Sequence, residues 1–323
     1  MNNSIQLTVE QINKMNPLDI VKNEAVKSRF IEIRSTIWRD EDAESVYEKE
    51  SRYFSALLDE KPELRDKSTP FSIFTAFIDL AVCGLSLEPG ARAQCYLMGR
   101  NAKIGQHYDA AKGKNVYDYE GRCVLTISGY GELVQRQRCG QIRYADNPTL
   151  VYAEDEFSFS DKDGRKSVSY TCHLPHTSGH IVAAFLRITR NDGSVDYSVM
   201  YEEDWLRLMN YSLKNNTRFN YKTNQWEGQA NELYGNPEQG VGIDSGFLCA
   251  KLIKHAFKTY PKLRIGKGTE LQTEQEEPQP EIDDYYGVKG GAPEEKPQPQ
   301  EPFGNQPDFS GGVKVEDSND GAF

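Results

Sequence analysis

The chain has 323 residues, of which 37% are hydrophobic and 27% charged, a composition that allows one large domain or two ordinary ones but leans polar. No apolar run approaches the ~18 residues that span a bilayer, and the first residues lack the basic and apolar regions of a secretory signal. The six cysteines are scattered without a CxxC pair, which argues against a zinc site or a disulfide framework and favours reduced thiols in a cytosolic protein.

The net charge of −11 comes from the C-terminal end of the sequence. Thr269–Phe323 holds 14 acidic residues and three lysines, so the first 268 residues are balanced at 35 acidic and 35 basic. From Gly266 onward Gln, Glu, Pro and Gly predominate, a composition typical of a disordered tail. The overall acidity therefore does not exclude a basic surface on the folded part.

Residues 1–66 are predicted to be helical. Pro17 is able to open one helix at its first turn, and a second helix is predicted from Glu41 to Leu58. Acidic residues lie near the start of this second helix, where the helix dipole favours them. These helices form either a layer packed on its own core or an element that contacts other subunits.

A buried helix and two strands are predicted next. The motif Ser68-Thr69-Pro70 caps a nearly apolar helix from Phe71 to Val82, which is expected to be buried on most sides and to end at Gly84. The following predictions are a strand at 93–98, a loop or hairpin at 99–105, an exposed polar loop at 106–120 and a central strand at 123–128.

The second half of the chain is predicted to alternate strands and turns. Asp-Gly turn signals lie among four strand candidates, at 150–159, 168–174, 180–188 and 195–201. Helices are predicted at 132–139, 202–209 and 246–260. The segment 210–244 has little periodicity and is predicted to be irregular.

Enzyme signatures such as GxxxxGK[ST], GxSxG and HExxH do not occur in the sequence. Two sets of side chains suggest a metal or catalytic site. One is the three histidines His173, His176 and His180, and the other is the four carboxylates Asp79, Glu88, Asp118 and Glu132, the first three of which are those that a Mg²⁺-dependent nuclease would use. Exposed loop histidines are the simpler interpretation of the first set. Because Asp79 lies on an apolar helix it needs a partner, and a hydrogen bond or ion pair is the simpler interpretation there.

Two basic segments are the strongest functional signal. Residues 92–143 hold nine Lys and Arg against four acids, and residues 251–268 hold six against none. Lys251, Lys254 and Lys258 recur at three and four residues, so they are predicted to share one helix face that meets solvent or a ligand. Such a row is able to track a phosphate backbone without reading sequence. The alternative is an ordinary solvated lysine face.

Six short pieces of sequence occur in an order that matches a known family. They are Gly84-Leu-Ser-Leu-Glu-Pro-Gly90, Tyr96-Leu97, Ile127-Ser-Gly-Tyr130, Arg138-Cys-Gly-Gln-Ile142, Glu154-Asp-Glu-Phe-Ser-Phe159 and Phe257-Lys-Thr-Tyr-Pro261. Each piece is unspecific alone. Their order over residues 68–262 resembles the RecT family of phage single-strand DNA annealing proteins.

The resemblance implies an α+β fold with three parts. A RecT-like core at 67–265, with a twisted, mainly antiparallel sheet flanked by helices, follows a helical N-terminal region at 1–66 that is able to make subunit contacts. A disordered acidic tail occupies 266–323. The activity implied is ATP-independent annealing of complementary strands, without a cofactor, by a ring or helical filament that holds DNA in a basic groove.

The partners implied are single-stranded DNA and its annealed duplex, other copies of the chain, a phage exonuclease and the host single-strand binding protein, in the cytoplasm of a bacterial host. The acidic tail ending in Phe323 is similar to the tip of bacterial single-strand binding proteins. It is predicted to compete for their partners, to shield the basic groove before DNA arrives, or only to keep the protein in solution.

The predicted DNA contacts are eight basic residues on phosphates and one tyrosine at the groove: Arg100, Lys103, Arg136, Arg138, Arg143, Lys251, Lys254, Lys258 and Tyr130. Two other functions stay open at this point. One is a Mg²⁺-dependent DNA nuclease that uses the carboxylates, and the other is an oligomeric phage structural protein that does not bind DNA.

Overall fold

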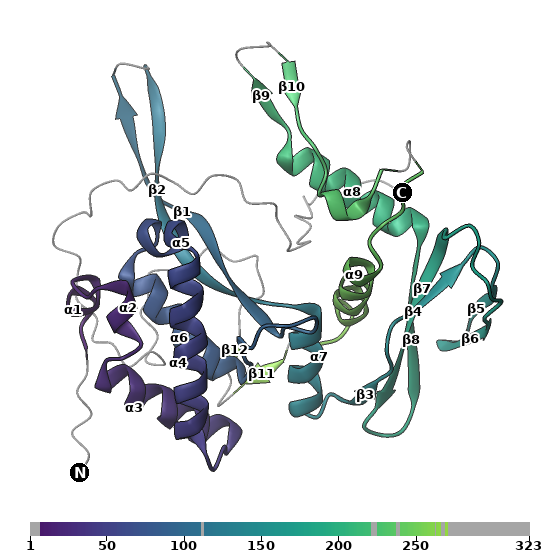
Figure 1. The fold of residues 1–323 in the computed structure, drawn as a ribbon, viewed down its shortest axis with the longest axis horizontal. Coiled ribbons are helices and arrows are strands. Elements are labelled where there is room, and N and C mark those ends of the chain that lie inside the picture. Colours follow the sequence, from purple (N-terminus) through teal and green to yellow (C-terminus); the bar gives the residue numbers. More distant parts are fainter. Residues whose placement is uncertain are drawn as a thin grey trace, which may run out of the picture. The chain divides into compact units, whose positions relative to one another are not determined.

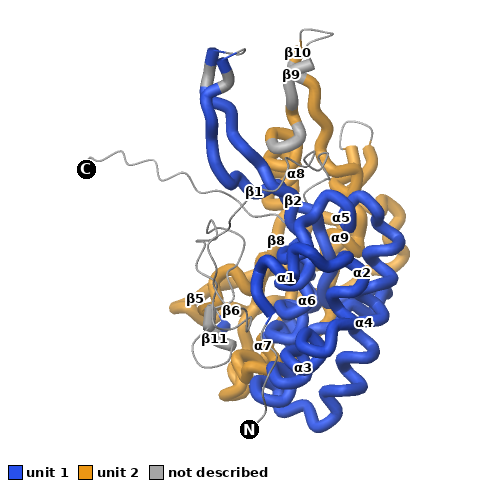
Figure 2. Tube along the Cα trace, turned by 90° about the vertical axis from the view of Figure 1, so that its left-hand side faces the viewer, with its two compact units in different colours: residues 1–135, 263–270, 279–306 blue, residues 136–262, 271–278, 307–323 orange. Residues whose placement is uncertain are grey.

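The computed structural model describes residues 7–110, 113–220, 225–236, 240–261, 263–265 and 269–270. Figure 1 shows the fold, and the chain divides into two units, Met1–Gln135 with Leu263–Glu270, and Arg136–Lys262 (Figure 2). Of the predicted tail at 266–323, only residues 269 and 270 lie within the described part, where β12 (Thr269–Glu270) pairs with β11 (Arg264–Ile265). Within the described residues no helix is long and apolar enough to cross a membrane.

The first unit begins with helices, as predicted. They are α1 (Val9–Asn13), α2 (Pro17–Ile20), α3 (Glu24–Ile33), the π-helix η1 (Arg34–Trp38), α4 (Ala43–Glu60), α5 (Pro62–Lys67) and α6 (Pro70–Cys83). Their core is an aromatic cluster centred on Phe77 of α6. The Phe77 ring stacks on Phe30 at 4.8 Å between centroids and meets Tyr47 and Phe54 edge-on, an arrangement that adds to the burial of these rings.

Helix α6 begins and ends where its sequence predicts. Thr69 accepts the capping hydrogen bond at its start, and Gly84 takes the left-handed conformation at its end, with φ 67°. The indole Nε1 of Trp38 donates to the carbonyls of Ala81 and Val82 at 3.2 and 3.1 Å, so last-turn acceptors are satisfied. A side chain at Gly84 would overlap the Trp38 ring, which is a second reason for glycine there.

A long antiparallel hairpin includes 99–105, where a loop or hairpin was predicted, and replaces the exposed loop predicted at 106–120. Strands β1 (Cys95–Asp109) and β2 (Lys114–Ile127) pair along their whole length in a sheet of two strands (Figure 1). The segment 123–128 therefore is not a central strand. Outer hairpin residues are exposed on one face and exposed or half-buried on the other, so no buried apolar face marks the strands in the sequence. Helix α7 (Gly129–Arg138) follows.

The second unit contains a four-stranded antiparallel sheet with β7 (Ile181–Arg190) in the middle. Strands β3 (Ile142–Ala145) and β4 (Thr149–Tyr152) follow one another along one edge of β7, and β8 (Val195–Tyr201) pairs with the other edge. Helix α9 (Ser245–Phe257) packs on β7 and β8. Helices and antiparallel strands together confirm the predicted α+β class.

Two further predictions about this unit are corrected by the structure. The strand predicted at 150–159 is divided by a turn into β4 and β5 (Glu156–Lys162), and β5 pairs with β6 (Arg165–Thr171). The segment 210–244 is more regular than predicted. It contains the end of α8 (Glu202–Asn216), β9 (Arg218–Asn220), β10 (Gln225–Glu227) and the 3₁₀ helix η2 (Glu232–Tyr234).

Candidate nucleic-acid interface

The predicted contacts Arg100 and Lys103 lie on β1 of the hairpin. Arg100 is half-buried and opposite Arg122, whose Nε donates to Glu120 at 2.9 Å. Lys103 is exposed, and its Nζ lies 3.4 Å from the centroid of the Tyr117 ring, a cation–π contact. Lys103 therefore presents its charge at the surface of the hairpin beside an aromatic ring.

Tyr130 lies in the first turn of α7 and is half-buried. The guanidinium of Arg92 lies 5.9 Å from the centroid of its ring. The start of α7 is fixed by Ser128, whose hydroxyl accepts from the N–H of Gly131 at 3.0 Å. A side chain at Gly131 would overlap the carbonyl of Gln94, so the glycine after Tyr130 lets the helix approach the chain before β1 closely.

Arg136 is buried, with 5% of its surface exposed. Its guanidinium donates to the side-chain oxygen of Gln141 and to the carbonyls of Phe257 and Pro261, at 3.4 and 3.3 Å for the two carbonyls. It also lies 4.7 and 5.7 Å from the ring centroids of Phe257 and Tyr260. The structure thus gives Arg136 a packing role, which joins the end of α7 to the end of α9.

Arg138, Arg143 and Lys258 are exposed, and Lys254 is half-buried. Arg143 lies on β3, Lys254 on α9 and Lys258 directly after α9. Of the carboxylates that the structure describes, none forms a salt bridge with Lys103, Arg143, Lys254 or Lys258. Their charges are therefore available to an anionic ligand.

Lys251 does not share the exposed face predicted for it. Only 7% of its surface is exposed, and its Nζ lies 4.9 and 5.8 Å from the ring centroids of Phe247 and Tyr234. The Tyr234 ring meets Phe247 edge-on at 5.0 Å. The physical reason is that η2, from the segment predicted to be irregular, folds over this side of α9.

The predicted contacts are distributed over the two units. Arg100, Lys103 and Tyr130 belong to the first, and the remaining six belong to the second. The expectation that both sets line one groove stays a prediction.

The three carboxylates that a nuclease would use do not lie close together. Glu88 pairs with Lys49 at 2.5 Å and Asp118 with His107 at 2.8 Å, whereas Asp79 lies on α6. Throughout the described part of the chain, neither these three nor any group containing them forms a cluster able to hold a metal ion.

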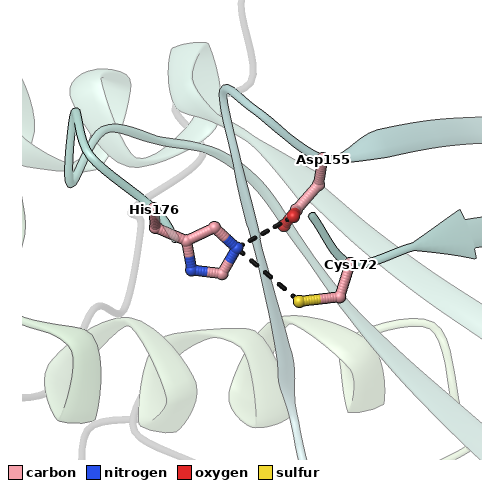
Figure 3. A group of neighbouring side chains, drawn as sticks. All are labelled: Asp155, Cys172 and His176. Carbon is pink, nitrogen blue, oxygen red and sulfur yellow. Dashed lines mark hydrogen bonds and ion pairs between the residues drawn. The ribbon is translucent and has the colours of Figure 1, made fainter. Parts of the chain in front are cut away.

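One group with metal-ligand chemistry does occur, at Asp155, Cys172 and His176 (Figure 3). The three ligand atoms lie within 4.8 Å of one another, and all three residue types bind zinc. Both contacts use the same ring nitrogen, because His176 Nε2 lies 2.8 Å from Asp155 Oδ1 and 3.7 Å from Cys172 Sγ. A relay from a cysteine nucleophile through two ring nitrogens to an acid is therefore excluded.

Hydrogen bonds within the protein account for the position of Asp155. Its side chain is fully buried, and four donors reach it: the N–H groups of Tyr152 and His173, the Tyr170 hydroxyl and the His176 ring. Burial alone would raise the pKa of the Asp155 carboxyl, but these hydrogen bonds outweigh it and hold the pKa well below its ordinary value. Asp155 thus connects the β4–β5 turn to the loop after β6 through hydrogen bonds.

The three histidines of the predicted metal site do not converge. The His173 ring lies 3.9 Å from Glu156, the His180 ring lies 3.3 Å from Glu202, and of the three imidazole rings only that of His176 reaches Asp155. Of Asp155, Cys172 and His176, only His176 was a candidate from the sequence. Asp155 was missed because it falls inside a segment that was predicted to be one continuous strand.

Comparison with known proteins gives one match. The model of the RecT family matches residues 35–232, which is more than half of the chain. Neither the curated proteins nor the solved structures contain a match.

Proposed function

Because the chain belongs to the RecT family, we propose that it holds single-stranded DNA by its phosphates and anneals complementary strands without ATP. Proteins of this family act in single-strand DNA annealing and recombination of the phage type, and they are not classical enzymes. The proposal extends this family role to particular side chains of the chain.

The observation that supports it most directly is the set of cations without carboxylate partners, the exposed Lys103, Arg143 and Lys258 and the half-buried Lys254. A body with equal numbers of acidic and basic residues has enough carboxylates to pair every cation. Cations left unpaired at the surface favour an external polyanion, since each phosphate that they neutralise releases counterions. Arg100 and Arg138 complete the proposed phosphate contacts, and Tyr130 is the proposed aromatic contact.

Arg136 and Lys251 are not part of the proposed contact set. Both are buried and engaged with aromatic rings, so a phosphate could reach them only after local unpacking. We assign them to the packing of α9 instead.

Phosphate contact fits the annealing reaction because it leaves base edges free to pair. No covalent bond changes, so neither a nucleophile nor a cofactor is needed. The proposed working form is a ring or helical filament of identical chains in the bacterial cytoplasm, beside a phage exonuclease and the host single-strand binding protein.

The test is the double charge reversal Arg138→Glu with Lys254→Glu. We expect loss of single-strand binding and of annealing, with an unchanged circular dichroism spectrum and melting temperature. Lys162→Glu with Arg165→Glu is the matched control, because these exposed residues face each other at the β5–β6 turn and the charge change is the same. Normal annealing by the first variant would contradict the proposal.

A second measurement addresses the alternatives. Electron micrographs of the protein, with two complementary oligonucleotides added in turn, should show rings or filaments. Shortened DNA after incubation with Mg²⁺ would favour a nuclease, and an absence of salt-sensitive affinity for single strands would favour a structural protein.

A further inference from the structure

The outer half of the β1–β2 hairpin is an arm made of two strands only (Figure 1). Its register pairs Lys103 with Tyr119, Gln106 with Tyr117 and Tyr108 with Asn115. Residues directly opposite one another in an antiparallel pair project from the same face, and so do residues two apart along one strand. Because the register shifts between Lys103 and Gly105, all six of these side chains lie on one face.

We call this surface the tyrosine face: Lys103, Gln106, Tyr108, Asn115, Tyr117 and Tyr119. Its three tyrosines are 66%, 47% and 44% exposed, in chain order. Single exposed aromatic residues are ordinary on protein surfaces, whereas a contiguous group of them marks a binding surface. The contact of Lys103 with the Tyr117 ring confirms that the side chains of the two strands meet on this face.

The opposite face of the hairpin differs in its charges. It carries the acids Asp118 and Glu120, and each is paired within the hairpin, with His107 at 2.8 Å and Arg122 at 2.9 Å. The tyrosine face contains no acidic residue. A polyanion is therefore repelled less by the tyrosine face, and Lys103 on that face attracts it.

We propose that the tyrosine face binds single-stranded DNA by stacking its rings on unpaired bases. This inference rests on the proposed function and deepens it, since the basic residues hold phosphates and this face holds bases. Alternate residues of a strand lie about 6.8 Å apart, twice the ~3.4 Å between stacked bases. Tyr117 and Tyr119 therefore have the spacing needed to enclose one base between them.

Stacking on this face selects single strands over duplex. Each base in a duplex is already stacked on its neighbours and paired with its complement, whereas an unpaired base offers its ring to an aromatic side chain. Lys103, which lies over Tyr117 when no base is present, is placed to pair with the adjoining phosphate when a base takes its position. Strands that have annealed would lose the stacking contacts and leave the face.

The test uses the full chain and two oligonucleotides of equal length, one normal and one composed of abasic sites. The double variant Tyr117→Ala with Tyr119→Ala should bind the normal strand about tenfold or more weakly, and the abasic strand as the wild type does. Tyr117→Phe with Tyr119→Phe keeps both rings and should bind both strands normally. Val116→Ala, on the opposite face, is the control for a change in the hairpin itself.

The outcomes separate the two proposals. If the wild type binds neither strand, the proposed function fails. If it binds normal DNA and the alanine variant binds equally well, phosphate binding stands and the stacking inference is overturned. If the alanine variant changes the sedimentation of the protein without DNA, the face is a contact between copies of this chain and the inference is also overturned.

Discussion

The β1–β2 hairpin and the junction of α7 with α9 use the same residue types in opposite ways. Lys103 is exposed beside a tyrosine on the hairpin, whereas Arg136 at the junction and Lys251 elsewhere on α9 are buried among aromatic rings. Both arrangements are cation–π contacts, but only the first leaves the charge within reach of a ligand. Basic composition therefore indicates a DNA-binding surface only after burial is known.

Removing the buried charge at the junction should have the largest effect. Arg136→Ala takes away hydrogen bonds to two carbonyls and one amide oxygen, and it should lower the free energy of unfolding by about 2–4 kcal/mol. Urea denaturation measures this. The neighbouring exposed Arg138→Ala should change stability by less than ~0.5 kcal/mol. Equal effects of the two substitutions would contradict the assignment of Arg136 to packing.

Substitutions of Lys251 test the same comparison and should have a smaller effect on the free energy of unfolding. Lys251→Met keeps an unbranched side chain against Phe247 and Tyr234 and should cost less than ~1 kcal/mol. Lys251→Glu places an acid against the faces of these rings and should cost about 2 kcal/mol or more. Thermal unfolding distinguishes the variants. If the methionine variant is folded but no longer binds single strands, Lys251 is a DNA contact after all.

The carboxylates of Asp155 and Asp118 also differ in burial, and their contributions to stability can be compared by changing the pH. Asp155 is buried under four hydrogen bonds, whereas Asp118 on the hairpin is partly exposed with one partner. Because the pKa of Asp155 is lower in the folded protein than the ~3.9 of an unfolded chain, its stabilisation is complete above about pH 4 and is lost as pH falls further.

The corresponding measurement is the melting temperature of the wild type and of Asp155→Asn between pH 7 and pH 3. The variant should melt several degrees lower at pH 7, and the difference should shrink below about pH 4. The melting temperature of Asp118→Asn should differ little from that of the wild type at pH 7 and at pH 3. A constant difference for Asp155→Asn across this range would contradict the role given to its ionised carboxylate.

The sequence predicted best those features of the fold that depend on residues close to one another in the chain. Helix α6 follows from its cap at Thr69 and its glycine at position 84, and these signals act within one turn of the helix. The hairpin was missed because no buried apolar face marks its outer strands in the sequence. The burial of Lys251 depends on Tyr234, and a contact between residues distant in sequence leaves no periodic signal.

Candidate site residues were predictable in type but not in exposure. The count of basic residues indicated a polyanion, and Lys103, Arg143 and Lys258 are exposed as that role requires. The tyrosines at 117 and 119 have the two-residue spacing of one strand face, but Val116 beside them interrupts the apolar–polar alternation by which a strand is recognised. That these tyrosines belong to a larger exposed surface follows only from the pairing of the two strands, which places Lys103 and Tyr108 on the same face.

The salt dependence of single-strand affinity tests the central claim most directly, that exposed cations and not buried ones hold the phosphates. For single strands each phosphate contact contributes about −0.7 to the slope of log K against log salt concentration. Arg143→Ala with Lys258→Ala, which removes two exposed cations, should therefore reduce the magnitude of the slope by about 1.4 relative to the wild type. An unchanged slope, with DNA still bound, would contradict the account.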